Sequence, residues 1–294
     1  MWPIDEFLNY LKYERNYSDR TVEAYGDDLR QFEMFGNEMW KELKPEQVEA
    51  DLVREWMVSL MEQKYTTTSV NRKLSSLRAY FKYMLKQGLV ERDPMRKIVG
   101  PKNKKPLPVF VKEEEMDRLL DGDFFGDDFE GCRDKCIVET FYSTGVRRSE
   151  LIGLNDVDVD FQAEVIKVTG KRNKQRIIPF DKALKEELQS YLTRRNNDIP
   201  LRSEAFFVKQ TGERITAGMV ERIVKKYLSK VVTIKKRSPH VLRHSFATAM
   251  LNHQAELGAI KELLGHESLA TTEIYTHTTF EELKKVYNQA HPRA

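Results

Sequence analysis

The stretch SPHVLRHSFATAML (residues 238–251) places two histidines and an arginine near the start of a predicted helix. Its opening Ser-Pro pair is typical of a helix N-terminus, because serine can cap a free N–H group and proline has none to lose there. At 3.6 residues per turn, His240, Arg243 and His244 share one face and the apolar residues share the opposite one. Free N–H groups and the positive end of the helix dipole attract a phosphate. The stretch therefore predicts a site where an imidazole and a guanidinium meet an anion.

Four further stretches carry side chains that suit the same chemistry. STGVRRSEL places Arg147 where a helix begins after a glycine break, and TGKRNKQR places Lys171 at the mouth of a hairpin turn. ELLGHESLATT presents His266 directly after a glycine that ends a helix, and TTEIYTH carries Tyr275 on a short final element. Taken singly, each of these residues has an ordinary structural explanation, such as a surface ion pair or a packed ring.

Together these side chains supply the groups that metal-free cleavage of a phosphodiester requires. Arg147 and Arg243 can hold the non-bridging oxygens and stabilise the charge that grows in the transition state. The Tyr275 phenol is a competent nucleophile once a neighbour removes its proton. Lys171 or a histidine can protonate the departing 5′ oxygen. We therefore expect a strand-cleaving site that uses neither a metal nor a cofactor.

The charge of the chain favours a polyanionic partner. The formal net charge is only +3, but residues 66–105 and 222–255 form two strongly basic tracts that acidic residues elsewhere balance. Two separated tracts of this kind favour a surface that follows a polyanion over a merely solvated face. Within the first tract, the polar face of a predicted helix carries Arg72, Ser75 and Arg78, a mixture that suits phosphates and base edges.

Composition excludes several other classes of protein. A hydrophobic content of 40% and a charged content of 32% suit a soluble globular chain. No apolar run approaches the roughly 18 residues that a membrane span needs, and the first residues lack the pattern of a signal peptide. Cys132 and Cys136, the two cysteines, lie four apart on one predicted helix and fit buried thiols in a reducing compartment. We expect a cytoplasmic protein without a membrane partner.

The elements that must position the candidate site are mainly helices. Apolar residues recur at three-to-four spacing in four stripes of the first hundred residues, the last being Val70, Leu74, Leu77, Phe81 and Leu85. GPKNKKPLP shows no periodicity and indicates a boundary. NDVDVDF, EVIKVTG and QRIIPF predict a small three-stranded antiparallel sheet between helical segments. We predict a mainly α protein with a helical N-terminal domain (1–100), a linker (101–110) and an α-rich C-terminal domain with a small sheet (111–294), which carries the candidate site.

The motifs TGVRRSEL, GKRNKQR, HVLRHSFATAML, LLGH and IYTH occur in the order and at the separations found in tyrosine recombinases. The chain resembles this family, the phage integrase family, over nearly its whole length, and it is most similar to the XerC/XerD type of site-specific recombinase. The resemblance implies a helical N-terminal domain and a catalytic domain that close as a C-shaped clamp around duplex DNA. It also implies cleavage through a covalent 3′-phosphotyrosyl intermediate that leaves a free 5′-hydroxyl.

The resemblance assigns roles residue by residue. The family's catalytic residues fall on Arg147, Lys171, His240, Arg243, His266 and Tyr275, with Tyr275 as the nucleophile and Lys171 as the general acid. Glu150 matches the acidic residue that supports the first arginine. DNA contacts outside the catalytic centre are expected at Arg72, Ser75, Arg78, Arg172, Lys174, Lys235, Lys236 and Arg237.

The family's reaction exchanges four strands, so the resemblance also implies an assembly. Four protomers meet on two DNA sites, as a homotetramer or as a heterotetramer with a related recombinase. The C-terminal helix near Leu283, Val286 and Tyr287 is expected to dock on a neighbour. A DNA translocase of the FtsK type is a further candidate partner. The implied role is Xer-type resolution of chromosome or plasmid multimers, in chromosome segregation at cell division.

Four other functions fit part of the pattern. A metalloenzyme could use His240 and His244 at i, i+4, but Val241 stands where a glutamate base is expected and Arg243 would repel a cation. A non-catalytic DNA-binding regulator needs the basic tracts but not Tyr275. A relaxing topoisomerase of the tyrosine type shares the chemistry and acts as a monomer. A mobile-element integrase is the main alternative; many of these carry an extra N-terminal arm-binding domain, and the direct start of this chain in core-binding helices favours the Xer type.

Overall fold

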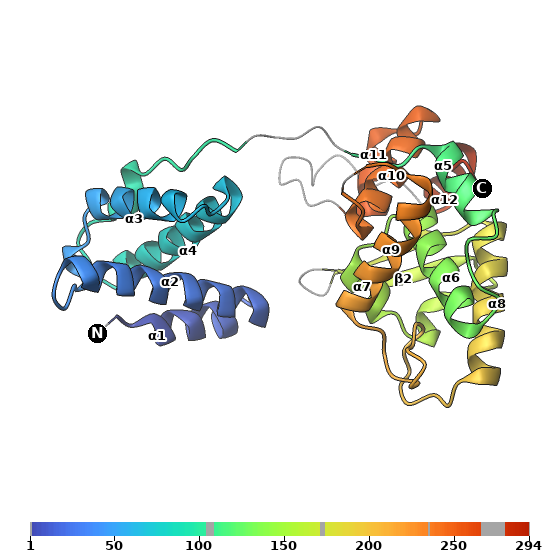
Figure 1. The fold of residues 1–294 in the computed structure, drawn as a ribbon, viewed down its shortest axis with the longest axis horizontal. Helices are drawn as coiled ribbons and strands as arrows, with labels where there is room; N and C mark the ends of the chain where they lie inside the picture. The colour runs from blue at the N-terminus through green and yellow to red at the C-terminus, as the bar shows by residue number, and fades with distance from the viewer. Residues whose placement is uncertain (1, 104–108, 171–173, 235, 266–279, 294) are drawn as a thin grey trace. The chain divides into compact units, whose positions relative to one another are not determined.

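The computed structural model describes residues 2–103, 109–170, 174–234, 236–265 and 280–293 (Figure 1). The chain divides into two compact units, Met1–Pro106 and Leu107–Ala294, each with its own hydrophobic core. Among the described residues, no helix is both long enough and apolar enough to cross a membrane.

Helices account for most of the first unit. They are α1 (Ile4–Asn9), which continues as a π-helical turn (Tyr10–Glu14), α2 (Asp19–Met39), α3 (Ala50–Glu62) and α4 (Thr67–Lys86), with short 3₁₀ turns at Pro45–Gln47 and Pro94–Lys97. The hydroxyls of Ser18 and Thr66 accept backbone N–H groups in the first turns of α2 and α4 and so cap both helices. The predicted apolar stripes pack into the core of this unit, except for Leu85, which is exposed at the end of α4.

A buried carboxylate ties α2 to α4. Asp28 on α2 accepts hydrogen bonds from Nη1 and Nη2 of Arg72 at 2.5 and 2.8 Å and from Nζ of Lys73 at 2.9 Å. The hydroxyl of Ser76 donates to the same carboxylate at 3.2 Å. Because a buried charge is costly unless it is paired and hydrogen-bonded, these donors stabilise the packing of the two helices.

The second unit combines helices with one small sheet. In chain order it contains α5 (Glu113–Leu120), α6 (Phe129–Thr144), α7 (Arg148–Gly153), a 3₁₀ turn (Asp156–Asp158), β1 (Val159–Asp160), β2 (Val165–Thr169), β3 (Gln175–Pro179), α8 (Lys182–Asp198), α9 (Ala217–Val231), α10 (Pro239–Asn252), α11 (Leu257–Leu264) and α12 (Phe280–Ala290). α6 lies between α8 and α9 and is buried along most of its length (Figure 1). It carries Cys136, which is buried, and Cys132, which is partly buried, both as free thiols.

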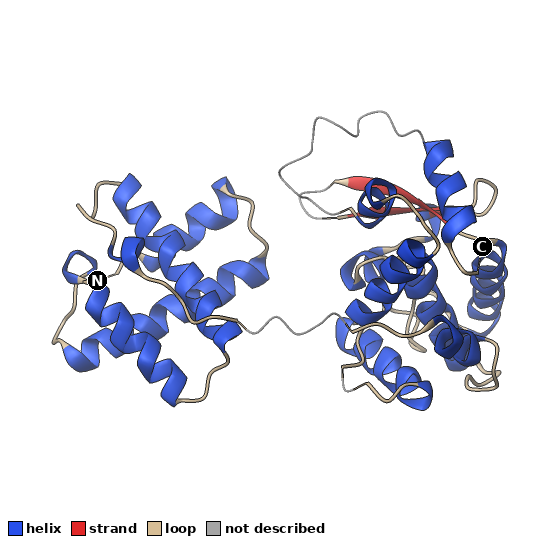
Figure 2. Cartoon of the chain, turned by 90° about the horizontal axis from the view of Figure 1, so that it is seen from above, coloured by secondary structure: helices blue, strands red, loops and turns tan. Residues whose placement is uncertain are grey.

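The predicted three-stranded antiparallel sheet is confirmed, with the order β1-β2-β3 (Figure 2). Its first strand is shorter than the alternating run NDVDVDF suggests. The Asp158 carboxylate accepts the backbone N–H of Asn155 at 3.0 Å and folds that part of the run into the 3₁₀ turn. Only Val159 and Asp160 remain to pair with β2.

The C-terminal helix packs against its own unit. Leu283 and Tyr287 on α12 are buried, and the Tyr287 hydroxyl donates to Asp181 at 3.1 Å. Beyond α12, the Arg293 guanidinium pairs with Asp117 and Asp121 of the α5 segment. The apolar side of α12, which the family resemblance assigns to a neighbouring protomer, is thus covered within this chain.

Candidate active site

Arg147 stands at the N-cap of α7, where its side chain and its backbone both bind Glu150. The backbone N–H of Arg147 donates to Oε2 of Glu150 at 2.7 Å, and Nη1 donates to Oε1 at 2.7 Å. This reciprocal arrangement arises locally, because a glutamate three residues into a helix can reach back to the N-cap N–H. The contact between Arg147 and Glu150 that the family resemblance implies is therefore present.

Arg243 lies in the second turn of α10 and is buried, with 8% of its surface exposed. Its Nη1 donates to the carbonyl of Gly145 at 2.5 Å and its Nη2 to the carbonyl of Leu264 at 2.6 Å. Helical spacing places Arg243 on the same face as His240 and His244 but does not show that the side chain is buried. It is buried here between the ends of two other helices, α6 and α11, which supply the two carbonyls.

Both arginines bind the same helix end. Nη2 of Arg147 donates to the carbonyl of Gly265 at 2.5 Å, next to the Leu264 carbonyl that accepts from Arg243. The carbonyls at a helix C-terminus carry partial negative charge and so attract cations. Gly265 adopts φ +61°, the left-handed conformation that glycine tolerates and that ends α11. The convergence lies directly before His266 in the sequence.

The sequence reasoning missed Arg176, a third arginine in this cluster. Its Nη1 and Nη2 donate to the two oxygens of Glu150 at 2.8 and 2.9 Å, and its Nε donates to the carbonyl of Leu263 at 2.8 Å. A signal was available in the strand period. Arg176 is two residues before Ile178, so both point to the same, buried face of β3, where an arginine needs a partner.

The hairpin that leads toward Lys171 begins beside the same carboxylate. A Cβ built on Gly170 would lie 3.3 Å from Oε1 of Glu150 and 3.9 Å from Nη1 of Arg147. Gly170 and Gly265 thus both border the Glu150 cluster, and each directly precedes a residue that the sequence assigns to catalysis.

The pKa values of Glu150 and Arg243 in this cluster are both far from their ordinary values. Burial raises the pKa of Glu150, but hydrogen bonds and charge from Arg176 and Arg147 outweigh burial and lower that pKa to about 2. Burial, followed by the charges of Arg147 and Arg176, lowers the pKa of Arg243 to about 10. Near neutral pH Glu150 and Arg243 are therefore both ionised, and three arginines surround this one carboxylate.

His240 stands in the first turn of α10 and is exposed. Partial burial lowers its pKa below 6.5, and nearby positive charge, first from Arg148 and then from Lys236, lowers it further. A neutral imidazole at pH 7 can accept a proton, which suits a group that assists proton transfer. Arg148 itself forms an ion pair with Glu221 on α9.

Five of the predicted site residues lie outside the described residues: Lys171, Arg172, Lys235, His266 and Tyr275. The remaining predicted DNA contacts lie on both units. Arg72 is bound to Asp28, while the Ser75 hydroxyl donates to the Asn71 carbonyl at 2.8 Å and Arg78 to the Ile98 carbonyl at 3.0 Å.

In the second unit, three predicted DNA contacts are described. The carbonyl of Lys174 accepts the Gly170 N–H at 2.8 Å and so closes the described base of the hairpin. Lys236 is exposed, and Arg237 donates to the Val232 carbonyl at 2.9 Å.

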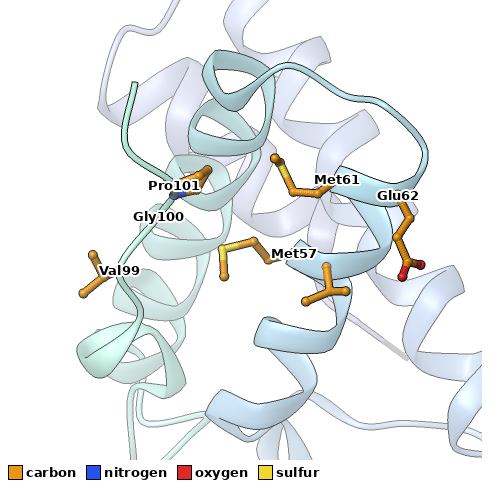
Figure 3. A pocket seen from close by; sticks show the side chains of 7 residues that line it. Met57, Met61, Glu62, Val99, Gly100 and Pro101 are labelled. Carbon is orange, nitrogen blue, oxygen red and sulfur yellow. The ribbon is translucent and has the colours of Figure 1, made fainter. Parts of the chain in front are cut away.

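A separate apolar pocket of about 420 Å³ lies in the first unit (Figure 3). Met57 and Met61 of α3 line one side, and Val99 and Pro101 line the other. Its lining is mostly apolar and does not contain a group of convergent polar side chains, so it does not resemble a catalytic site. In the described part of the chain, no group of three or more His, Cys, Asp or Glu side chains is arranged to hold a metal ion.

Two family models match the chain. The model described as "Phage integrase family" matches residues 110–282, and the one described as "Phage integrase, N-terminal SAM-like domain" matches residues 4–88. The tyrosine recombinase XerC of Chlorobaculum tepidum is 38% identical to this chain over 317 aligned residues, which cover 99% of this chain and 94% of that protein.

Two solved structures give the comparison in three dimensions. The XerA recombinase is 29% identical, with a TM-score of 0.50 over 99% of this chain and 98% of that chain. The Tn1549 transposon integrase, in complex with circular intermediate DNA, is 23% identical, with a TM-score of 0.71 over 97% and 98% of the two chains. At 23% identity, the similarity to the Tn1549 integrase concerns the fold alone.

The fold, the arginine–glutamate cluster and these matches define the class of the protein: it is an enzyme of the tyrosine recombinase type. The chain belongs to the phage integrase family. The predicted mainly α fold with a small sheet and the predicted resemblance to XerC-type site-specific recombinases are both confirmed.

Proposed function

We propose that this chain cuts and rejoins double-stranded DNA at specific sites through a covalent 3′-phosphotyrosyl intermediate, as a Xer-type recombinase that resolves chromosome or plasmid multimers. The observation that carries the proposal is the convergence of Arg147 and Arg243 on the carbonyls of Gly265 and Leu264. These arginines are 96 positions apart in the sequence, yet one helix end holds both guanidinia, directly before the histidine of the LGH motif. Similarity to XerC over nearly the full length supports the Xer type.

We propose a division of labour among the catalytic residues, in which the roles of Lys171, His266 and Tyr275 follow from the family resemblance. Arg147 and Arg243 hold the non-bridging oxygens of the scissile phosphate and stabilise the charge that develops there. The Tyr275 oxygen forms a bond to phosphorus while the bond from phosphorus to the 5′ oxygen breaks. Lys171 protonates that oxygen, His266 contacts the phosphate, and His240 assists proton transfer.

Burial increases the effect of the second arginine. Arg243 is nearly removed from water, so its charge acts on a bound phosphate through a medium of lower dielectric constant. Its protein partners fix the guanidinium before substrate binds, which avoids reorganisation at the moment of reaction. The phosphotyrosyl bond conserves the energy of the broken bond, so we expect no requirement for ATP or a metal ion.

DNA binding is proposed to use both units. Residues 1–100 form the core DNA-binding domain, 101–110 the linker, and 111–294 the catalytic domain, and the two domains close around duplex DNA. The contacts outside the catalytic centre are Arg72, Ser75, Arg78, Arg172, Lys174, Lys235, Lys236 and Arg237. Phosphate contacts of this kind release counterions, so affinity should fall steeply as salt rises.

Recombination requires four protomers on two DNA sites. We propose a tetramer, either of this chain alone or with a related recombinase, acting in the cytoplasm, with a DNA translocase of the FtsK type as a further partner. In this assembly α12 would exchange its contacts within the chain for contacts with a neighbour.

A suicide substrate tests the chemistry. Wild-type protein incubated with a nicked version of its own DNA site, in excess chelator and without ATP, should form a covalent complex. Tyr275→Phe should bind DNA with wild-type affinity and form none, while the control Tyr13→Phe, at an exposed position of the first unit, should behave as wild type. Tight specific binding by wild type without any adduct would identify a regulator instead.

A second assay tests the biological direction of the reaction. A plasmid that carries two directly repeated copies of the site should be resolved into two circles by the wild-type protein. Integration of a circular element into a second site, without resolution of direct repeats, would favour a mobile-element integrase.

A further inference from the structure

Arg176 occupies an inward position on the sheet. Its cross-strand partner is Val168, which is 1% exposed, and the side chain of Arg176 itself is 15% exposed. From there it donates from three nitrogens to two elements other than its own strand. Its two terminal nitrogens donate hydrogen bonds to the two carboxylate oxygens of Glu150 on α7, and its Nε donates to the carbonyl of Leu263 on α11. Arg176 thereby joins β3, α7 and α11.

The Glu150 carboxylate has two principal sources of donors. Each of its oxygens accepts one hydrogen bond from Arg147 and one from Arg176. Without Arg176, one half of the donors to a 1%-exposed side chain would be missing. The carboxylate would then rotate or protonate, and the Arg147 guanidinium bound to it would lose its fixed position.

Arg176 also packs against the turn that ends α11. A Cβ built on Gly265 would lie 3.1 Å from Cδ and 3.2 Å from Nε of Arg176. The arginine side chain therefore fills the space beside the glycine whose carbonyl accepts from Arg147. Contacts on both sides of the Arg147 guanidinium, at Glu150 and at Gly265, thus depend on this one side chain.

We propose that Arg176 is a positioning residue for strand cleavage, which holds the Arg147 guanidinium in place through Glu150 and through the Gly265 turn. This inference rests on the proposed function, because it concerns the phosphate that Arg147 would bind. Arg176 donates its hydrogen bonds to protein groups and therefore acts on the phosphate only through Arg147. A misplacement of a catalytic group by about 1 Å costs roughly a hundredfold in rate.

The test compares Arg176→Met with Arg176→Lys. Methionine keeps an unbranched stem beside Gly265 but removes the charge and all the donors, whereas lysine keeps the charge and can still bind Glu150. Single-turnover cleavage of the nicked suicide substrate is measured at saturating protein between pH 5.5 and 8.5, together with the Kd for the site. We expect Arg176→Met to bind within about twofold of wild type and to cleave between about tenfold and a hundredfold more slowly at pH 7. Arg176→Lys should recover most of that loss.

The pH profile distinguishes positioning from a general loss of structure. In the wild type, Arg147 and Arg176 hold the pKa of Glu150 far below the assay range, and Arg243 is the third charged group near it. Burial raises the pKa of Glu150, and without Arg176 fewer hydrogen-bond donors counteract that effect. The pKa of Glu150 therefore rises in the variant. Cleavage by Arg176→Met should then fall at the acidic end of the range, and the double variant Arg176→Met with Glu150→Gln should lack that fall.

Arg195 provides a matched control. It is another buried arginine of the second unit, bound bidentately to Asp156 and also to the Phe206 carbonyl. Arg195→Met should lower thermal stability without changing the shape of the pH profile of cleavage.

The outcomes separate the positioning role of Arg176 from the proposed function. Wild-type rate and pH profile in Arg176→Met would overturn the positioning role, as would a slow Arg176→Lys whose profile matches that of the control. If Arg176→Met does not fold, cleavage by Arg176→Lys at less than a hundredth of the wild-type rate, with normal DNA binding, would also overturn it. Failure of the wild type to form any adduct would instead refute the proposed function.

Discussion

Replacing Glu150 by glutamine removes the charge from a carboxylate that two arginines share, and the structure sets the size of the effect. The folded-state pKa of Glu150 is about 2, against 4.5 for an unperturbed glutamate. A difference of this size corresponds to about 3 kcal/mol of stability. Removing one partner of a buried ion pair costs about 3–5 kcal/mol by a separate line of reasoning. We therefore expect Glu150→Gln to lower the free energy of unfolding of the second unit by about 3–5 kcal/mol at pH 7.

The sign of the pH dependence follows from the lowered pKa. The stabilisation from ionised Glu150 is fully present above pH 4.5 and is lost as the pH falls from 4.5 through about 2. The glutamine variant lacks this stabilisation at every pH, because its side chain cannot ionise. The difference in stability between wild type and Glu150→Gln should therefore stay constant between pH 7 and pH 5 and narrow below pH 4.5.

The tryptophans make the assay specific to one unit. All three, Trp2, Trp40 and Trp56, lie in the first unit. In urea unfolding, tryptophan fluorescence follows that unit, while far-UV circular dichroism follows the helices of both. Glu150→Gln should shift the dichroism transition of the second unit and leave the fluorescence midpoint unchanged.

Glu221→Gln serves as the control for this prediction. Glu221 pairs with Arg148, but its side chain is 48% exposed, so its loss should cost no more than about 1 kcal/mol. A loss below about 1 kcal/mol for Glu150→Gln, or a difference from wild type that does not narrow in acid, would refute the assignment of Glu150 as a buried, arginine-held carboxylate.

Three further outcomes are expected from other parts of the structure. Asp28→Asn should destabilise the first unit by about 3–5 kcal/mol, because it leaves Lys73 without its buried counter-charge; an unchanged midpoint in tryptophan fluorescence would contradict this. Gly265→Ala should cost about 1–2 kcal/mol for its positive φ and should slow cleavage while DNA binding stays normal, since its Cβ would press on Arg176; wild-type cleavage would count against the packing described. The NMR titration of His240 should have its midpoint below 6.5, and a midpoint at or above that value would show that partial burial and the surrounding positive charge do not act on the imidazole as described.

The sequence predicted features that depend on local spacing. The helix beginning at Pro239 and the glycine-ended helices before Gly145 and Gly265 follow from local geometry, and all are present. The contact of Glu150 with Arg147, which the family resemblance implies, is present as well. Each involves residues no more than about one helical turn apart.

Features that depend on distant parts of the chain were not predictable in the same way. Arg243 is buried because carbonyls 98 and 21 positions away accept from it, and helical periodicity carries no information about such partners. Arg72 was placed on a polar face by periodicity, yet its guanidinium is bound to a carboxylate 44 positions earlier. For Arg176 the strand period did carry a signal, an inward-facing charge, but its partners could be named only from the folded chain.

Main-chain carbonyls accept hydrogen bonds from both proposed phosphate-binding arginines, and this has a consequence for how the protein tolerates mutation. A carbonyl belongs to every amino acid, so exchanging Leu264 for another residue that keeps α11 intact leaves the acceptor for Arg243 in place. Substitution at such a position therefore keeps the hydrogen bond to the arginine. Gly145 and Gly265 are constrained instead, because both have positive φ and close neighbours where a Cβ would stand. Tolerance to substitution around the two arginines should therefore be uneven. In a deep mutational scan we expect Leu264 to accept other apolar residues, whereas Gly145 and Gly265 should accept almost no other residue.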